Sequence, residues 1–72
     1  MGTVAGMRAA VLAEIRRVPS TADEVAEKLG LSILSVRPRC SELRHFGKIV
    51  YSGKRRKNAV SGINAAVWMV RP

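Results

Sequence analysis

Apolar residues recur at helical spacing near the start of the chain. Intervals of three and four residues, which define one face of a helix, connect Met7, Val11, Leu12, Ile15 and Val18. Pro19 then ends the pattern, because proline cannot continue a helix. We therefore expect a first helix over about residues 4–18.

The next segment, STADEVAEKLG, carries signals for both ends of a short helix. Thr21 and Glu24 have the spacing of a capping box, in which a hydroxyl and a carboxylate each accept a hydrogen bond from a free backbone N–H. Gly30 is typical of the residue that ends a helix. These signals predict a helix over about residues 22–29, followed by a tight connection.

A third helix is expected over about residues 35–46, with a buried stripe at i, i+4 and i+7 formed by Val36, Cys40 and Leu43. Pro38 decides where this helix begins. If Ser35 is the N-cap, Pro38 falls in the first turn, where its missing N–H has no intrahelical partner to lose. A start at Ser32 is the alternative, and it would place Pro38 inside the helix with a lost hydrogen bond. We expect the start at Ser35.

The period changes after Gly47. The segments KIVYSG and AAVWMV alternate as strands, and the polar, glycine-bearing segment KRRKNAVSGIN lies between them. This pattern predicts a hairpin over about residues 48–70, with the cations Lys54, Arg55, Arg56 and Lys57 at its tip. The whole chain, residues 1–72, is then one α+β domain with the element order of a winged helix-turn-helix, three helices followed by a β-hairpin wing.

The charge of the chain is strongly asymmetric. Its formal net charge is +8, and four basic and four acidic residues cancel in residues 1–29. Residues 30–72 hold nine basic residues against Glu42 alone, so the whole excess lies there. This distribution predicts a surface that faces a polyanion.

Composition also excludes several function classes. Cys40 and His45 are the only residues of their types, so we expect neither a disulfide nor a metal site. The five carboxylates suggest no acid–base pair, which argues against an enzyme, a cofactor and a small-molecule substrate. The start of the chain lacks a secretory pattern and no apolar run could span a membrane. We therefore expect a protein of the cytoplasm.

Residues 21–71 resemble the small winged-helix DNA-binding proteins of bacteriophages and prophages. The resemblance rests on LSVRPRCSELR, on GKIVYSGKRRKN, and on the closing SG and VW before a basic end. It implies that the third helix enters the major groove of double-stranded DNA and that the hairpin lies over the backbone or the adjacent minor groove. Such modules serve transcription, replication and packaging, so the role within this class stays open.

The third helix carries the candidate DNA contacts. At about 100° per residue, Pro38, Ser41 and His45 lie opposite the buried stripe. Arg37, near the leading end, is the candidate for reading a base, and Arg44 is the candidate for holding a phosphate. Arg39 flanks the other side of the exposed face, where an ion pair with Glu42 is the alternative to a DNA contact.

Further phosphate contacts are expected outside the exposed face of the third helix. Hydroxyl groups at helix starts belong to Thr21, Ser32 and Ser35, although capping alone would explain them equally well. The hairpin contributes Lys48, Lys54, Arg55, Arg56, Lys57 and Asn58. Mutual repulsion and the flanking Gly53 and Gly62 predict a tip that is mobile without DNA.

The sequence therefore predicts a sequence-specific DNA-binding regulator of phage type, located with the nucleoid of a bacterial cell. One alternative is a phage-type interaction module that binds an acidic host protein through the same basic surface. The other is an RNA-binding winged helix, which the scarcity of exposed aromatic residues disfavours. A homodimer on DNA is compatible with the first interpretation.

Overall fold

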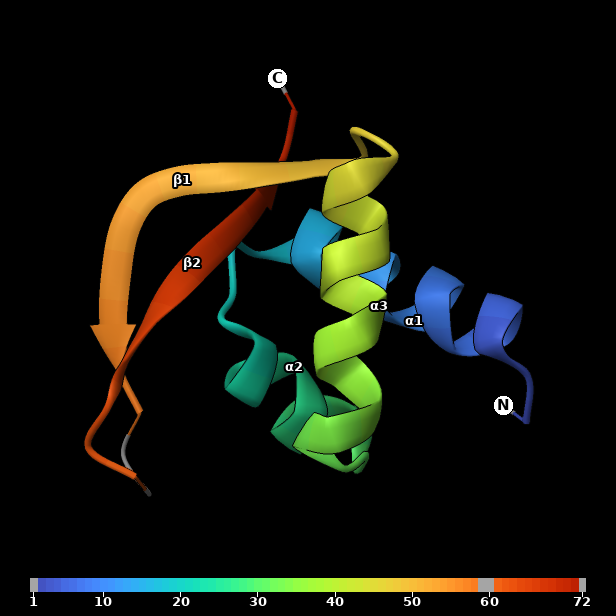
Figure 1. Ribbon diagram of the computed structural model, residues 1–72, viewed down its shortest axis with the longest axis horizontal. Coiled ribbons are helices and arrows are strands. Elements are labelled where there is room, and N and C mark those ends of the chain that lie inside the picture. The colour runs from blue at the N-terminus through green and yellow to red at the C-terminus, as the bar shows by residue number, and fades with distance from the viewer. Residues whose placement is uncertain (1, 59–60, 72) are drawn as a thin grey trace.

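Three helices precede a two-stranded antiparallel hairpin, which makes this an α+β fold (Figure 1). The computed structural model describes residues 2–58 and 61–71. The elements are α1 (Val4–Arg17), α2 (Ala22–Leu29), α3 (Ile33–His45), β1 (Ile49–Lys57) and β2 (Asn64–Val70). Their types and order are those that the hydrophobic pattern predicted.

Side-chain caps define where the first two helices begin. The Thr3 hydroxyl accepts a hydrogen bond from the Gly6 N–H at 2.9 Å and starts α1. The predicted capping box of α2 is confirmed: the Thr21 hydroxyl accepts from the Glu24 N–H at 3.1 Å, and the Glu24 carboxylate accepts from the Thr21 N–H at 3.0 Å. These bonds satisfy donors that have no partner within the helix.

The predicted start of the third helix at Ser35 is wrong. α3 begins at Ile33, and Ser32 is its N-cap, with its hydroxyl accepting from the Leu34 N–H at 3.1 Å. The early start lets Ile33 pack against the core, and this burial offsets the cost of a proline further along. Pro38 is therefore the sixth helical residue and has no N–H to donate to the carbonyl of Leu34.

A tight turn at Gly47 connects α3 to β1. The Gly47 N–H donates to the Arg44 carbonyl at 3.0 Å, and the Lys48 N–H donates to the Leu43 carbonyl at 2.8 Å. This pair of bonds is a Schellman motif, which needs a left-handed residue, and Gly47 has φ of 73°. The turn sends the chain across the end of α3 into the hairpin.

β1 is longer than predicted and bends sharply in its middle (Figure 1). Tyr51 pairs with Trp68 and Arg55 pairs with Ala66, so β1 has more residues than β2 between these two pairs. Gly53, with φ of 88°, lies in this irregularity and supplies the conformation that the bulge needs. Beyond the bulge the hairpin turns back along the helices.

The predicted position of the basic cluster, in a loop at the hairpin tip, is wrong. Lys54, Arg55, Arg56 and Lys57 lie within β1 rather than in a loop at the hairpin tip, since the last three of them pair with β2. The connection between the strands is residues 58–63. Within it, Ala59 and Val60 lie outside the described residues.

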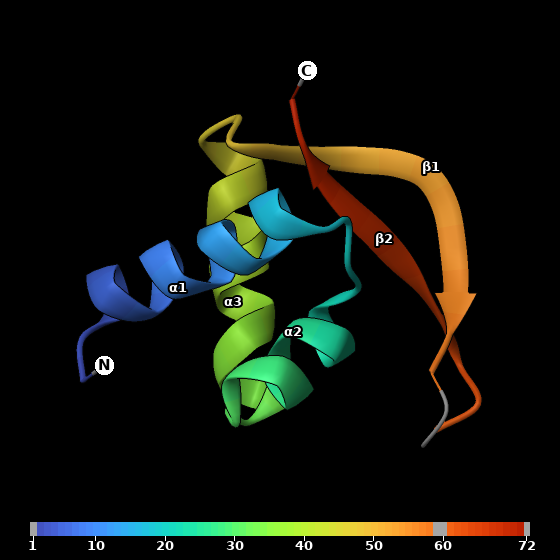
Figure 2. The same ribbon diagram turned by 180° about the vertical axis from the view of Figure 1, so that it is seen from behind.

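The core lies where the three helices meet the start of the hairpin. Its buried side chains include those of the predicted α3 stripe, and they are Val11, Ile15, Val25, Ala26, Val36, Cys40, Leu43 and Ile49. α1 crosses α3 on the side away from the viewer of Figure 1, as Figure 2 shows from behind. The core therefore covers one face of α3 and leaves the opposite face to solvent.

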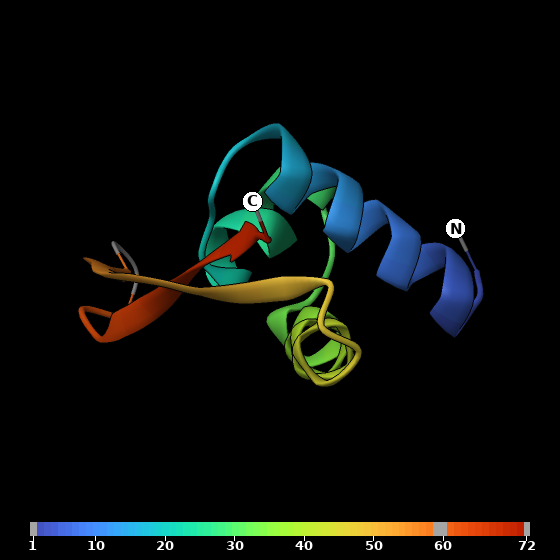
Figure 3. The same cartoon turned by 90° about the horizontal axis from the view of Figure 1, so that it is seen from above.

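The connection between α1 and α2 fixes the hairpin against the helices. Ser20 forms an isolated antiparallel bridge with Trp68, with backbone N–H to carbonyl distances of 3.0 Å and 2.8 Å. From above, the hairpin extends sideways from the helices beside the open side of α3 (Figure 3). α3 and the hairpin (β1 and β2) thus form the two sides of a corner.

Candidate nucleic-acid interface

The exposed face of α3 is the one that the helical projection predicted. Val36, Cys40 and Leu43 are buried, while the side chains exposed to solvent are those of Leu34, Arg37, Pro38, Ser41, Arg44 and His45. The face is anchored by the core and by the turn at Gly47. The exposed side chains therefore project from a helix whose opposite face is packed against the core.

Arg37, Ser41 and Arg44 lie along the flank of α3 that faces the hairpin. With Ala65, Ala66 and Trp68 of β2 they line a hollow between the helix and the strand. The alanines leave this hollow open because their side chains are small. The two guanidinium groups therefore lie at the inner side of the corner formed by α3 and β2.

The two arginines of this flank are held differently. The guanidinium carbon of Arg44 lies 5.4 Å from the centre of the Trp68 ring, a cation–π contact that fixes its position. Arg37 forms no ion pair within residues 2–58 and 61–71. Arg44 is thus preordered, whereas Arg37 keeps its hydrogen-bonding capacity for an incoming partner.

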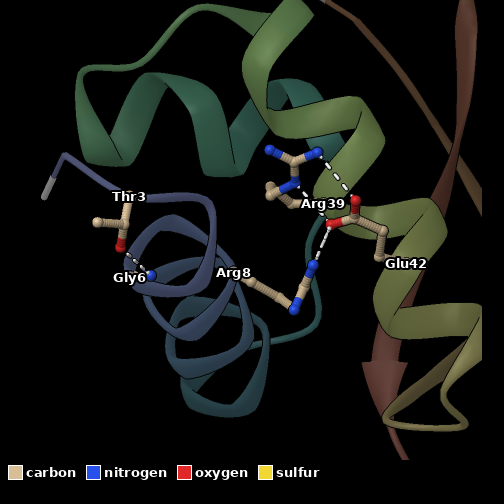
Figure 4. A network of polar contacts seen from close by, with 5 residues as sticks. All are labelled: Thr3, Gly6, Arg8, Arg39 and Glu42. Carbon is tan, nitrogen blue, oxygen red and sulfur yellow. Dashed lines mark hydrogen bonds and ion pairs between the residues drawn. The ribbon is translucent and has the colours of Figure 1, made fainter.

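Arg39 lies on the side of α3 that faces α1, where it pairs with Glu42 (Figure 4). Its Nε donates to Oε1 of Glu42 at 2.7 Å and its Nη2 donates to Oε2 at 3.0 Å. Arg8 of α1 donates to the same carboxylate at 3.0 Å and lies over the ring of Phe46. The ion pair that was the alternative for Arg39 is therefore present, and its side chain is only 14% exposed.

This double ion pair governs the ionisation of Glu42. The bonds from Arg39 and then from Arg8 hold the pKa of the Glu42 carboxyl below its ordinary value. Glu42, the only acidic residue after position 30, is consequently neutralised on the α1 side of the helix. The open flank of α3 itself then carries Arg37 and Arg44 and no acidic residue, although Asp23 of α2 lies across the hollow from it.

The cations of β1 fall into two groups. Arg56 is tied to Glu24 of α2, with its Nη1 at 2.5 Å from both carboxylate oxygens. Lys54, Arg55 and Lys57 are exposed and have no carboxylate partner among the described residues. Because side chains alternate along a strand, Arg55 and Lys57 lie on the hairpin face turned away from this pair.

Lys48 and Asn58 flank β1, one directly before it and one directly after it. Lys48 is exposed beside the turn that follows α3, and Asn58 lies in a second hollow, next to Arg37 and Asn64. The N–H of Asn58 donates to the Ile63 carbonyl at 2.9 Å, which closes the hairpin connection. Lys48 is thus placed for a contact near the end of α3, and Asn58 for one near its beginning.

The hydroxyl groups at the helix starts have unequal prospects as phosphate donors. Thr21 is 4% exposed, so burial keeps its hydroxyl from reaching a partner. Ser35 lies inside α3 and is half-buried. Ser32 is exposed at the N-terminus of α3, where its hydroxyl hydrogen can still be donated.

Two residues at this surface were missed by the sequence analysis. Asp23, in the first turn of α2, lines both hollows together with Arg37, and no local pattern indicated that α2 contributes to the corner. Leu34 is 79% exposed on α3. The signal for Leu34 was available, since a helix that starts at Ser32 places it one turn before Pro38.

Two further observations concern the thiol and the possible metal ligands among the described residues. Burial raises the pKa of the Cys40 thiol to about 11, which keeps it neutral and unreactive at physiological pH. The described His, Cys, Asp and Glu side chains form no group of three that could hold a metal ion. Every helix in residues 2–58 and 61–71 is too short or too polar to cross a lipid bilayer.

Comparisons with known proteins identify no family. No family model matches the chain, and neither a curated protein nor a solved structure is significantly similar to it.

Proposed function

We propose that this protein is a sequence-specific double-stranded DNA-binding protein of the winged-helix class. In this proposal α3 enters the major groove, and the hairpin, acting as the wing, lies over the backbone or the adjacent minor groove. Its role is that of a phage-type regulator of transcription or replication, which would act at the nucleoid of a bacterial cell.

The observation that carries the proposal is the set of unpaired cations on one helix and one strand. Arg37 and Arg44 lie on α3, and Lys54, Arg55 and Lys57 lie on β1, all without a carboxylate within 4 Å among the described residues. Glu24 and Glu42, the carboxylates that contact arginines of β1 and α3, are already paired with them. A polyanion is the partner that such a surface fits.

The packing of Trp68 favours duplex DNA over single-stranded nucleic acid. Trp68 packs against the core, meets Tyr51 edge to face at 6.4 Å between ring centres, and carries Arg44 over its ring. A base could stack on Trp68 only by displacing these neighbours. Trp68 is therefore not open as a stacking platform of the kind that single-strand binders use, whereas Tyr51 and Phe46 are exposed.

A salt titration tests the proposal. About five neutralised phosphates predict a slope of roughly −4 to −5 for the logarithm of the binding constant against the logarithm of salt concentration. Fluorescence anisotropy with a labelled random-sequence duplex measures this slope, and a single-stranded oligonucleotide of equal length is the control. Failure to bind the duplex even at low salt would overturn the proposal and favour an acidic protein partner.

A further inference from the structure

The outermost face of α3 carries an apolar pair beside the flank that holds Arg37 and Arg44. Leu34 is 79% exposed, and Pro38, one turn later, is exposed as well. Residues four apart on a helix lie on the same face, so the two side chains form a short apolar strip. Ser41 and His45 continue the face with neutral polar groups.

This strip is not part of the hydrophobic core. Ile33, the residue before Leu34, packs against the core, whereas Leu34 is absent from the side chains that pack there. The Ser32 cap and the start of α3 therefore fix Leu34 in a solvent-facing position. Exposed leucines are common, but this one lies on the face that the proposed function inserts into DNA.

The surrounding charge decides which partner the strip would meet. Arg37 lies on the adjacent flank, and α3 has no unpaired carboxylate, since Glu42 is bound to Arg8 and Arg39. A partner that complements this face offers an anionic group to Arg37 and an apolar group to the strip. In the major groove of duplex DNA that group is the 5-methyl of thymine.

We propose, on the basis of the proposed function, that Leu34 and Pro38 read thymine through its 5-methyl group. Arg37, on the neighbouring flank, reads a nearby guanine edge with its hydrogen-bond donors. α3 then distinguishes bases with two chemistries, an apolar one at its outermost face and a charged one beside it. Leu34 is the specificity-determining residue for the apolar contact with thymine.

Replacing thymine by uracil in DNA removes the methyl group and nothing else. The duplex that the protein prefers, enriched from a random pool, is synthesised with uracil in place of each thymine in turn. We expect one or two of these replacements to weaken binding of the wild-type protein about three- to fivefold, the effect of one buried methyl group. Leu34→Ala should bind the thymine and uracil forms equally.

Two controls separate this contact from a general effect. Val4→Ala removes another exposed aliphatic side chain, 50% exposed at the start of α1, and should keep the preference for thymine. Leu34→Met keeps an apolar side chain and should keep most of that preference. Thermal unfolding should show an unchanged midpoint for Leu34→Ala, because the side chain is not buried.

The outcomes are distinct. The inference is overturned if the preferred duplex contains no thymine, if no uracil replacement weakens binding, or if Leu34→Ala retains the wild-type preference for thymine over uracil. It is also overturned if Leu34→Ala weakens binding to an acidic protein partner and leaves DNA binding unchanged. Absence of any duplex binding by the wild-type protein would instead remove the proposed function itself.

Discussion

At the scale of single residues, Arg37 and Arg44 differ in whether a neighbouring side chain holds the guanidinium group in place. Arg44 is held over Trp68, and Arg37 has no ion-pair partner in the described part of the chain. A fixed guanidinium suits a phosphate, whose position varies little with sequence. A free one near the leading end of α3 can adopt the bidentate geometry that a guanine edge requires.

Arg37→Ala should therefore relax the preference at one base position and weaken binding to the preferred site by about 1–3 kcal/mol. Arg44→Ala should weaken preferred and random duplexes by a similar factor. Arg16→Ala, an exposed arginine on α1 with no ion pair among the described residues, is the matched control. Equal losses on both kinds of duplex for Arg37→Ala would show that Arg37 does not read a base.

Glu42 makes stability depend on acid pH. Because the folded pKa of its carboxyl lies below the ordinary value of 4.5, its stabilising contribution is complete above that value and disappears as pH falls through the folded pKa. Glu42→Gln should lower the melting temperature at neutral pH, and the difference from wild type should shrink as the solution is acidified. Glu27→Gln, on an exposed residue without an ion pair in the described residues, is the control. A difference that stays constant down to pH about 3 would contradict this role.

At the scale of elements, the start of α3 is the feature that local sequence could not decide. Ser32 and Ser35 are both acceptable caps, and the proline rule favours the later one. The earlier one prevails because Ile33 gains core contacts, a consequence of tertiary packing. The buried stripe, by contrast, followed from spacing alone and is confirmed.

The position of Pro38 yields a stability prediction. A proline in a helix interior costs up to about 3 kcal/mol relative to alanine, so Pro38→Ala should raise the free energy of unfolding by an amount within that range. For a domain of this size each 1 kcal/mol raises the melting temperature by roughly 4–8 °C. Ser41→Ala, on the same exposed face, controls for surface effects. An unchanged melting temperature for Pro38→Ala would indicate that α3 accommodates the ring without cost.

The hairpin shows a second limit of local sequence reasoning. Its strands were predictable from their alternation, but the bulge at Gly53 and the Ser20–Trp68 bridge depend on partners far along the chain. The basic cluster was consequently expected in a loop. In β1, its members have fixed neighbours, and Arg56 is committed to Glu24.

Replacing Lys54, Arg55 and Lys57 together with serine should cut affinity for DNA at least about tenfold and reduce the salt slope by about 3, since three phosphate contacts are removed. The melting temperature should change little, because these side chains are exposed and unpaired among the described residues. Arg56→Ser, which breaks only the Glu24 pair, should leave the salt slope nearly unchanged. A triple variant with the wild-type slope would exclude the hairpin from DNA binding.

At the scale of the whole molecule, the basic part of the sequence is also the part that forms α3 and the hairpin. The net charge of +8 resides in residues 30–72, and these residues form α3 and the hairpin, the two sides of the corner (Figure 3). The switch from helical to strand periodicity predicted the α+β class, and this is confirmed. The charge division is the basis of the prediction that residues 30–72 face a polyanion. The corner itself could not be predicted, because it depends on how the hairpin bends and attaches to the helices.

Selection from a random pool of duplexes tests the central claim, sequence-specific recognition of double-stranded DNA, most directly. The wild-type protein should enrich one motif that contains a guanine and a thymine, and Arg37→Ala in a parallel selection should lose the preference for that guanine. The symmetry of the motif reports whether one or two copies bind. A pool that remains random after repeated rounds, although the protein retains duplex, would contradict sequence-specific recognition.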